Sequence, residues 1–246
     1  MLSVGVFLFA TFIYGTLAYL IKRRIYNSLK IDRYQSFDWK PGHEWALILS
    51  PDFWWAIRFK SRAKALCAEH SKEKLKTFVT LSNTYNFWFS LAFGAITLIF
   101  ASHFPTSYIA QLLVSLAVLR FISRSLEITY AFVTDAFQDS ESTTGLTSKE
   151  RIILAMRSYV EIYFYSAPAY LLFTKCNDAW EAISLSMNIG TLTNVGQAFS
   201  IVGMGFEINM VFIQVFTTLS LVILSLASYL SRSEEIKQHR QTGENN

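Results

Sequence analysis

The feature that most constrains this chain is a series of largely apolar blocks, each about twenty residues long or longer. The first block covers residues 2–21 and carries no charge; the others lie at about 85–104, 107–133, 152–173 and 206–230. A helix of about 20 residues crosses the roughly 30 Å hydrocarbon core of a bilayer. The blocks therefore predict an all-α membrane protein with five transmembrane helices.

The composition agrees with a membrane protein and disfavours several other classes. Charged residues make up 16% of the chain, against about 25% in soluble domains. The cysteines and histidines match no metal or redox spacing, so we expect no metal site, no cofactor and no disulfide framework. We recognise no paired carboxylates and no nucleophile–base arrangement, and we therefore expect no enzyme and no catalytic residue. The net charge of +4 is expected to set membrane topology rather than to bind nucleic acid.

The basic residues predict the orientation. Thirteen of the 22 Lys and Arg lie between Lys22 and Lys76, and five spans leave only Lys175 on the opposite side. The positive-inside rule then places the N-terminus outside and the C-terminus in the cytosol. The first cations follow the first apolar block rather than precede it, which indicates a retained anchor instead of a cleaved signal peptide.

The blocks divide the chain into five units. These are an anchor (1–22), a basic, Trp-rich cytosolic or interfacial segment (23–83), a transmembrane hairpin (84–137), a fourth unit (150–232) and a cytosolic tail (233–246). Residues 52–66 mix aromatic side chains with four cations. They predict either a helix lying at the inner headgroup level, with its cations on anionic lipid headgroups, or a helix packed beneath the spans.

The segment 174–205, between the last two blocks, is not loop-like and contains no apolar run long enough to span a membrane. It predicts a half-length helix with Asn177 or Asp178 as its N-cap, followed by the uncharged sequence TLTNVG at 191–196. A short helix and an irregular return segment between two spans are the plan of a re-entrant pore loop, which must line water or be buried in protein. An ordinary outer loop with an amphipathic helix is the alternative.

Four segments carry a resemblance to a known family. They are RSLEITYAFVTDAF (124–137), ERIILAMRSYVEIYFYSAPAYLLF (150–173), AISLSMNIGTLTNVG (182–196) and MVFIQVFTTLSLVILSLASYLSR (210–232). The resemblance begins at the first segment. The second, third and fourth segments resemble the outer helix, the pore loop and the inner helix of the two-span potassium channels of bacteria. The third aligns without gaps to a pattern of the type ALYFSFVTLTTLGYG. The resemblance implies a homotetramer in a bacterial plasma membrane. Monovalent cations, with potassium expected, would pass a filter of backbone carbonyls built from Thr191, Leu192, Thr193, Asn194, Val195 and Gly196.

The filter departs from the family pattern at four positions. Asn194 replaces a glycine, Leu192 removes a hydroxyl and Val195 removes a tyrosine, while Gln197 replaces an acidic residue. The family geometry requires left-handed backbone at positions 194 and 196, which Asn adopts more readily than most residues. We therefore expect a potassium-conducting or weakly selective channel. A non-conducting scaffold or regulatory subunit that retains the channel fold is the alternative.

Further residues are candidates for the pore vestibule and for the hinge of the inner helix, on the basis of their positions in the sequence. Glu181, Gln197 and Glu207 are candidates for a pore vestibule, with solvated surface as the alternative. Gln214 stands where the family often has Gln or Glu, and Thr217 and Thr218 lie near the usual glycine hinge. Their hydroxyls are expected to bend or loosen the inner helix by bonding to its backbone.

Charged residues inside the spans are expected to be paired. Arg120 and Arg124 lie near the inner end of the third span, where they snorkel or pair with Glu127. Glu161 is a functional candidate because it is an intramembrane carboxylate, but Arg157 one turn earlier favours a structural ion pair. Thr147 or Ser148 is expected to cap the fourth span.

Overall fold

The structure is a computed structural model that describes residues 4–29, 44, 46–47, 50–66, 71–136, 145–174, 176, 178–202, 205 and 207–224. All regular secondary structure in these ranges is helical. The elements are α1 (Val4–Ser28), α3 (Pro51–Leu66), α4 (Ser71–His103), α5 (Tyr108–Ala136), α6 (Ser148–Phe173), α7 (Ala179–Gly190), α8 (Val195–Val202), α9 (Glu207–Leu219) and the π-helical turn η1 (Ser220–Leu224).

Three helices are long and apolar enough to cross a membrane. They cover Val4–Ser28, Lys72–His103 and Tyr108–Thr134, and they contain the first three predicted blocks. α6 contains the fourth predicted block, but five charged residues and four tyrosines make it less apolar than these three. The described part of the fifth block forms a shorter apolar helix, Ile208–Ile223.

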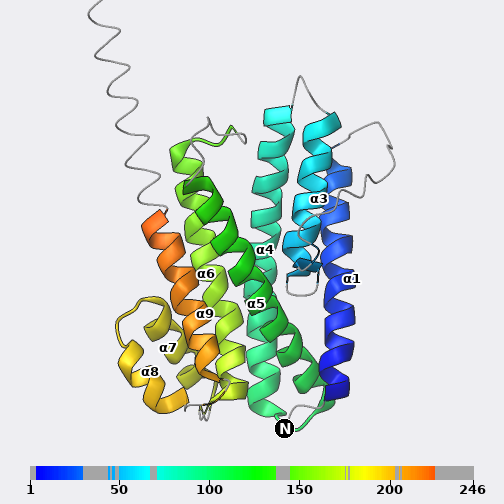
Figure 1. The fold of residues 1–246 in the computed structure, drawn as a ribbon. Helices are drawn as coiled ribbons and strands as arrows, with labels where there is room; N and C mark the ends of the chain where they lie inside the picture. The colour runs from blue at the N-terminus through cyan, green and yellow to red at the C-terminus, as the bar shows by residue number, and fades with distance from the viewer. Residues whose placement is uncertain are drawn as a thin grey trace, which may run out of the picture.

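The long helices run side by side along one axis (Figure 1). α6 contacts α4, α5, α7 and α9, and α1 contacts α3, α4 and α5. The main hydrophobic core lies among α5, α6, α7, α8 and α9, with Phe121, Tyr165, Tyr170 and Met210 fully buried in it. The shorter helices α7 and α8 lie together at the end of the bundle where α6 ends and α9 begins (Figure 1).

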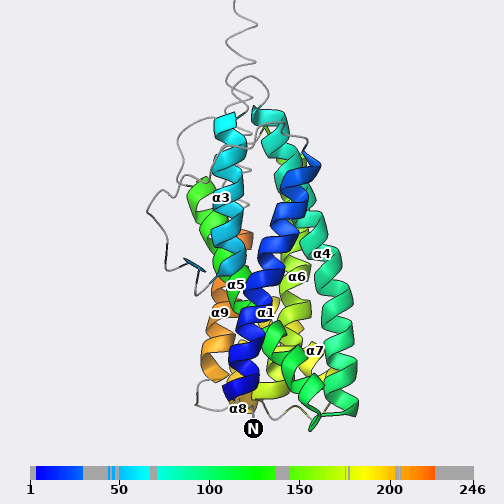
Figure 2. The same cartoon turned by 90° about the vertical axis from the view of Figure 1, so that its right-hand side faces the viewer.

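Helix α3 packs against the bundle instead of lying across its end. It runs nearly parallel to α1 in two perpendicular views (Figures 1 and 2), and it contacts α1, α4 and α5. Phe53, Trp54 and Phe59 are buried, which leaves few rings for a lipid surface. The structure therefore shows α3 packed against other helices, where burial of these rings removes apolar surface from water.

The first turn of α6 is fixed by a capping box. The Thr147 side chain accepts from the Glu150 backbone N–H at 3.3 Å, and the Glu150 carboxylate accepts from the Thr147 N–H at 2.8 Å. Just before it, Gly145 has a φ of 60°, a left-handed conformation that glycine adopts without steric cost. The prediction of a cap at this position is confirmed, with Thr147 rather than Ser148 as the capping residue.

Candidate functional site

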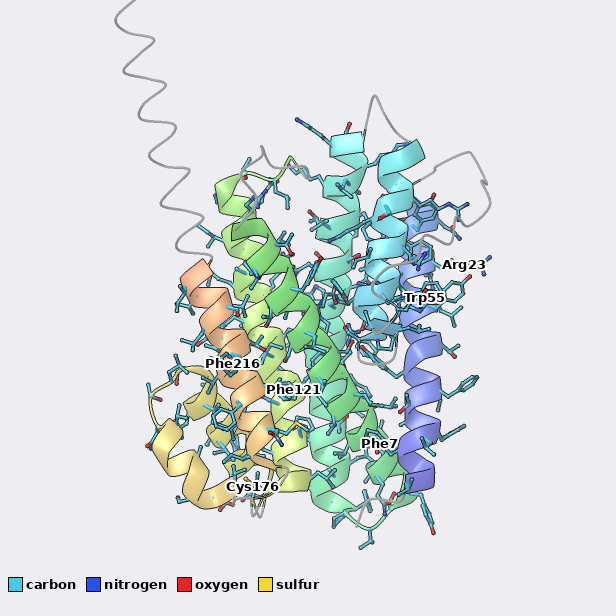
Figure 3. The ribbon with its side chains drawn as sticks, viewed as in Figure 1. Phe7, Arg23, Trp55, Phe121, Cys176 and Phe216 are labelled. Atoms are coloured by element: carbon cyan, nitrogen blue, oxygen red, sulfur yellow. The ribbon has the colours of Figure 1, made fainter. Side chains whose placement is uncertain are left out.

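The predicted half-length helix exists as α7 and begins at a capped residue. The Asp178 side chain accepts a hydrogen bond from the Glu181 backbone N–H at 2.9 Å, which confirms Asp178 as the N-cap; the alternative, Asn177, lies outside the described residues. α7 has twelve residues, about 18 Å at the usual helical rise. Figure 3 shows Cys176 at the end of the bundle where the chain passes from α6 to α7.

A short polar turn joins α7 to α8. Residues 191–194 are exposed and uncharged. The Thr191 hydroxyl donates to the Met187 carbonyl at 2.7 Å and lies 2.9 Å from the Thr193 hydroxyl. Both threonine side chains are therefore engaged in local hydrogen bonds at the end of α7.

The expected extended filter is not present in the structure of the single chain. Val195 and Gly196 are the first residues of α8, so the segment turns back as a helix. The positive φ of this segment is at Leu192, with φ 59°, and neither Asn194 nor Gly196 has one. An extended segment in one chain would leave its backbone groups without partners, whereas a helix pairs them internally, as in the Ala198 N–H to Asn194 carbonyl bond of 3.3 Å.

The structure describes the side chain of only one of the three vestibule candidates. Glu181 is exposed in the first turn of α7. Gln197 lies in α8 and Glu207 is the first residue of α9, but their side chains lie outside the described residues. The structure therefore gives a surface position for Glu181 and only a backbone position for the other two.

Gln214 connects three helices and is fully buried. Its Oε1 accepts from the Tyr170 hydroxyl at 2.7 Å, and its Nε2 donates to the Ser186 carbonyl at 2.8 Å. The Ser186 hydroxyl lies 2.6 Å from the Ser166 hydroxyl. The amide thus holds α7 between α6 and α9 by hydrogen bonds in a buried environment, a role that sequence reasoning did not assign to it.

The close contact between α6 and α7 also depends on a glycine, Gly190, at the end of α7. The Tyr159 hydroxyl donates to the Gly190 carbonyl at 3.0 Å. A Cβ atom at Gly190 would lie 2.1 Å from Tyr163 Cε1 and 2.9 Å from Gln214 Nε2. The end of α7 therefore fits against α6 only with glycine at this position.

The predicted hinge region of the inner helix contains a helical irregularity. Thr217 and Thr218 are buried, and the Thr217 hydroxyl donates to the Ile213 carbonyl at 2.7 Å. The π-helical turn Ser220–Leu224 follows directly. The predicted hydroxyl-to-backbone bond is therefore confirmed for Thr217. Such a bond bends a helix, and a π-turn interrupts its regular hydrogen bonding.

A second polar centre lies inside the bundle, where α5 meets α6. The Arg124 Nε donates to Glu161 Oε1 at 2.7 Å and its Nη2 donates to Glu161 Oε2 at 2.8 Å, while Nη1 contacts Glu127. The predicted pairing of Arg124 with Glu127 is confirmed. The predicted pairing of Glu161 with Arg157 is wrong, because Arg157 donates to the Thr84 hydroxyl at 2.9 Å instead.

Arg120 extends this centre toward α1, α3 and α4. Its Nη2 donates to Asn86 Oδ1 at 2.8 Å, and its Nη1 forms an ion pair with Asp52. The Tyr14 hydroxyl donates to Asp52 Oδ2 at 2.6 Å. Both arginines are thus buried and paired, and they do not snorkel.

Lys22 completes the centre, which we call the buried ionic cluster. Its Nζ lies 4.0 Å from Asp52 Oδ1 and 4.0 Å from Glu127 Oε1, and its side chain is 0% exposed. The cluster contains three cations and three carboxylates: Lys22, Arg120 and Arg124 with Asp52, Glu127 and Glu161. The opposite charges balance, which is how ionisable groups are tolerated away from water.

Sequence reasoning missed the roles of Lys22 and Asp52. Lys22 stands among the cations that close the first apolar block, and Asp52 lies at the start of the Trp-rich helix, so each reads as a surface residue in the sequence. One signal was available in the sequence: no carboxylate lies within one helical turn of Arg120. A buried arginine therefore needed a carboxylate from elsewhere in the chain.

The described residues contain no group of three or more His, Cys, Asp or Glu side chains placed to hold a metal ion. Cys176, between α6 and α7, contacts the Thr174 hydroxyl at 2.9 Å, and burial raises the pKa of its thiol. A raised pKa disfavours the thiolate, which is the nucleophilic form of cysteine.

The described residues thus form two separate polar features. One is the hairpin of α7 and α8 with the turn 191–194 between them, packed against α6 and α9, and the other is the buried ionic cluster. Comparison of the chain with protein-family models, with curated proteins and with solved structures gives no match.

Proposed function

We propose that the chain is a subunit of a pore-loop cation channel, in which α7, the turn 191–194 and α8 form a re-entrant hairpin. The observation that supports this most is the position of the turn. It is uncharged and exposed, yet the helix before it is held between α6 and α9 by the buried hydrogen bonds of Gln214. An exposed polar turn on a rigidly held helix suits a path for hydrated or partly dehydrated ions.

In this proposal five helices cross the membrane: α1, α4, α5, α6 and the helix formed by α9 and η1. The basic residues between α1 and α4 lie on the cytosolic side, and the connection between α6 and α7 lies outside. The hairpin then enters from the outer face. A bacterial inner membrane is the proposed location, on the basis of the family resemblance.

Conduction would require several copies of the chain, because one hairpin does not enclose a path. We propose a homotetramer with the turn 191–194 near its axis. Exposed apolar side chains on α7, α9 and η1 support such an interface: Met187, Phe216, Val222 and Ile223 are 52%, 64%, 51% and 56% exposed. They would contact neighbouring subunits around the axis.

A non-conducting membrane scaffold or regulatory subunit is the second candidate, and a specific observation favours it. Val195 and Gly196 belong to α8, and the hydroxyls of Thr191 and Thr193 bond locally. In this conformation the segment offers few carbonyls to an ion. Conduction therefore requires residues 195–196 to leave the helix when the subunits assemble.

Ion flux from proteoliposomes separates the two candidates. The purified chain is reconstituted, and efflux is measured under potassium and under sodium gradients, with cross-linking in the same vesicles to count subunits. Flux that prefers potassium supports a selective filter, and flux without preference supports a weakly selective pore. A stable tetramer without flux, also after the Asn194→Gly change, supports the non-conducting subunit and contradicts the channel.

A further inference from the structure

A cavity of about 210 Å³ lies beside the buried ionic cluster. Residues from α1, α3, α4, α5 and α6 line it, so it lies among helices that are distant in sequence. Figure 3 shows the region: Arg23, which follows the cavity residue Lys22, and Trp55 lie on α1 and α3 in the half of the bundle away from the α7–α8 hairpin. The cavity is therefore separate from the proposed ion path.

The charges that line the cavity do not balance. Among the described residues, four cations line it and only one carboxylate, Glu127, does so; the cations are Lys22, Lys60, Arg124 and Arg151. Arg124 is already bound to Glu161. Lys22 and Arg124 belong to the buried ionic cluster, whose charges balance, so the further positive charge of the lining is that of Lys60 and Arg151. An anion in the cavity would be attracted by these groups.

Two lining residues carry buried donors that lack hydrogen bonds within the described structure; the acceptor Asn83 Oδ1, on the same wall, also has no hydrogen-bond partner there. Lys22 is 0% exposed, and its Nζ has only the two carboxylate contacts at 4.0 Å. The Ser82 Oγ, on α4, is buried and also has no hydrogen-bond partner. Buried donors without partners are rare in folded proteins, and both are donors that an anionic oxygen would satisfy.

Much of the remaining wall of the cavity is apolar, although Asn83, Asn86 and Ser158 also line it. Phe78, Val79, Ile128, Phe132 and Leu154 contribute to the apolar part. Lys60 lines the cavity from α3, and burial lowers the pKa of its ammonium group, an effect that a bound anion would oppose. Cations beside an apolar wall suit a ligand with an anionic head and a hydrocarbon chain.

We propose that this cavity binds the phosphate headgroup of an anionic membrane phospholipid, with Lys22, Lys60 and Ser82 as its ligands. The lipid would be bound between helices rather than on the outer surface of α3. The proposal is independent of ion conduction, because it rests on the cavity and not on the α7–α8 hairpin.

Binding is tested on the full-length protein in detergent with three probes: dioleoyl phosphatidylglycerol, dioleoyl phosphatidylcholine and inorganic phosphate. Native mass spectrometry counts bound lipid, and thermal unfolding over a concentration series gives the affinity. We expect one phosphatidylglycerol molecule to bind this cavity more tightly than phosphatidylcholine. Equal affinity for the two lipids would contradict an anionic site.

Two variants locate the site. Lys60→Gln should weaken phosphatidylglycerol binding about fivefold, the effect expected for one cation near a phosphate. Ser82→Ala should weaken it about threefold and leave the unfolding temperature of the lipid-free protein unchanged, because Ser82 has no hydrogen bond to lose. Lys22 is not substituted, because its removal would leave buried carboxylates without a cation.

Lys149→Gln is the matched control, since Lys149 is exposed at the start of α6 and does not line the cavity. Its affinity for phosphatidylglycerol should equal that of the wild type. If inorganic phosphate binds as tightly as the lipid with the same variant dependence, the site is for a soluble phosphate and the lipid is excluded. If Lys60→Gln and Ser82→Ala bind phosphatidylglycerol like the wild type, the cavity is not the site.

Discussion

The guanidinium of Arg124 on α5 and the carboxylate of Glu161 on α6 form two parallel hydrogen bonds, of 2.7 and 2.8 Å, inside the bundle. Both side chains are almost fully buried. This bidentate pair fixes the rotation of α6 against α5, because both groups are shielded from water and the paired geometry is directional. α6 in turn supports α7, so the pair contributes indirectly to the position of the hairpin.

Glu161→Gln should destabilise the protein by about 3–5 kcal/mol, because it leaves the Arg124 charge only partly compensated in a buried place. Thermal unfolding in detergent measures the effect. The double variant Arg124→Met with Glu161→Met should be more stable than Glu161→Gln, since no buried charge of this pair remains.

Arg157→Gln is the control for that pair. Arg157 precedes Glu161 by one helical turn, but it donates to Thr84, so its removal should cost only about 1 kcal/mol. A loss as large as that of Glu161→Gln would mean that Arg157, and not Arg124, neutralises the carboxylate.

Gly190→Ala should destabilise the docking of α7 by about 1–3 kcal/mol, because the added methyl group overlaps Tyr163. Gly196→Ala is the matched control: no heavy atom lies within 4 Å of its added Cβ, and alanine favours a helix over glycine. Unfolding temperatures of the two variants give the comparison. Similar losses in both would contradict the close contact at Gly190.

Gln214→Leu should lower the free energy of unfolding by about 1–3 kcal/mol, because the buried Ser186 carbonyl and Tyr170 hydroxyl each lose a hydrogen-bond partner. Tyr170→Phe should cost about 1 kcal/mol, and the double variant should cost less than the sum, since the two residues share a hydrogen bond. Gln111→Leu serves as the control, because its buried Oε1 has no hydrogen-bond partner among the described residues. Additive losses would show that Gln214 and Tyr170 act separately.

The first turn of α6 should loosen in acid. The hydrogen bonds from Lys76 and Thr147 lower the pKa of Glu150 from 4.5 to about 2. A carboxylate with a lowered folded-state pKa stabilises the folded form fully above pH 4.5, and this contribution is lost as the pH falls toward 2. Hydrogen exchange of the amides at 148–152 should therefore show less protection at pH 2.5 than at pH 5.5, after correction for the intrinsic rates.

Glu150→Gln removes the titrating group, so the corrected protection of the same amides should be independent of pH over this range. Amides in the middle of α6 report on global unfolding and serve as an internal reference. Equal acid sensitivity of the variant and the wild type would assign the effect to another group.

Asn194→Gly combined with Val195→Tyr should raise the preference for potassium over sodium in the flux assay, because it restores residues with which the resembled family builds its filter. Leu192→Gly is a control of a different kind. It should stabilise the turn by about 1 kcal/mol, since Leu192 holds a positive φ that glycine adopts freely, without changing the ion preference. An unchanged preference and conductance in the double variant would mean that the filter lies elsewhere.

The sequence by itself predicted most of the helical elements, though not α8, and narrowed two helix starts to pairs of adjacent residues. Apolar blocks of membrane-spanning length predicted the helices that became α1, α4 and α5, and local capping chemistry gave Asn177 or Asp178 for α7 and Thr147 or Ser148 for α6, of which the structure has Asp178 and Thr147. These features depend on residues within one or two turns of each other, so they can be read from spacing alone.

Only the tertiary structure decided which charges meet. Lys22, Asp52, Arg124 and Glu161 come from four helices that are far apart in the sequence, and spacing favoured the local partner Arg157 for Glu161. In a buried environment an ion pair is selected by the geometry of the packed helices, because both groups must be satisfied where they are buried. The same reason explains the turn 191–194: its backbone took the conformation that satisfied its own hydrogen bonds in one chain.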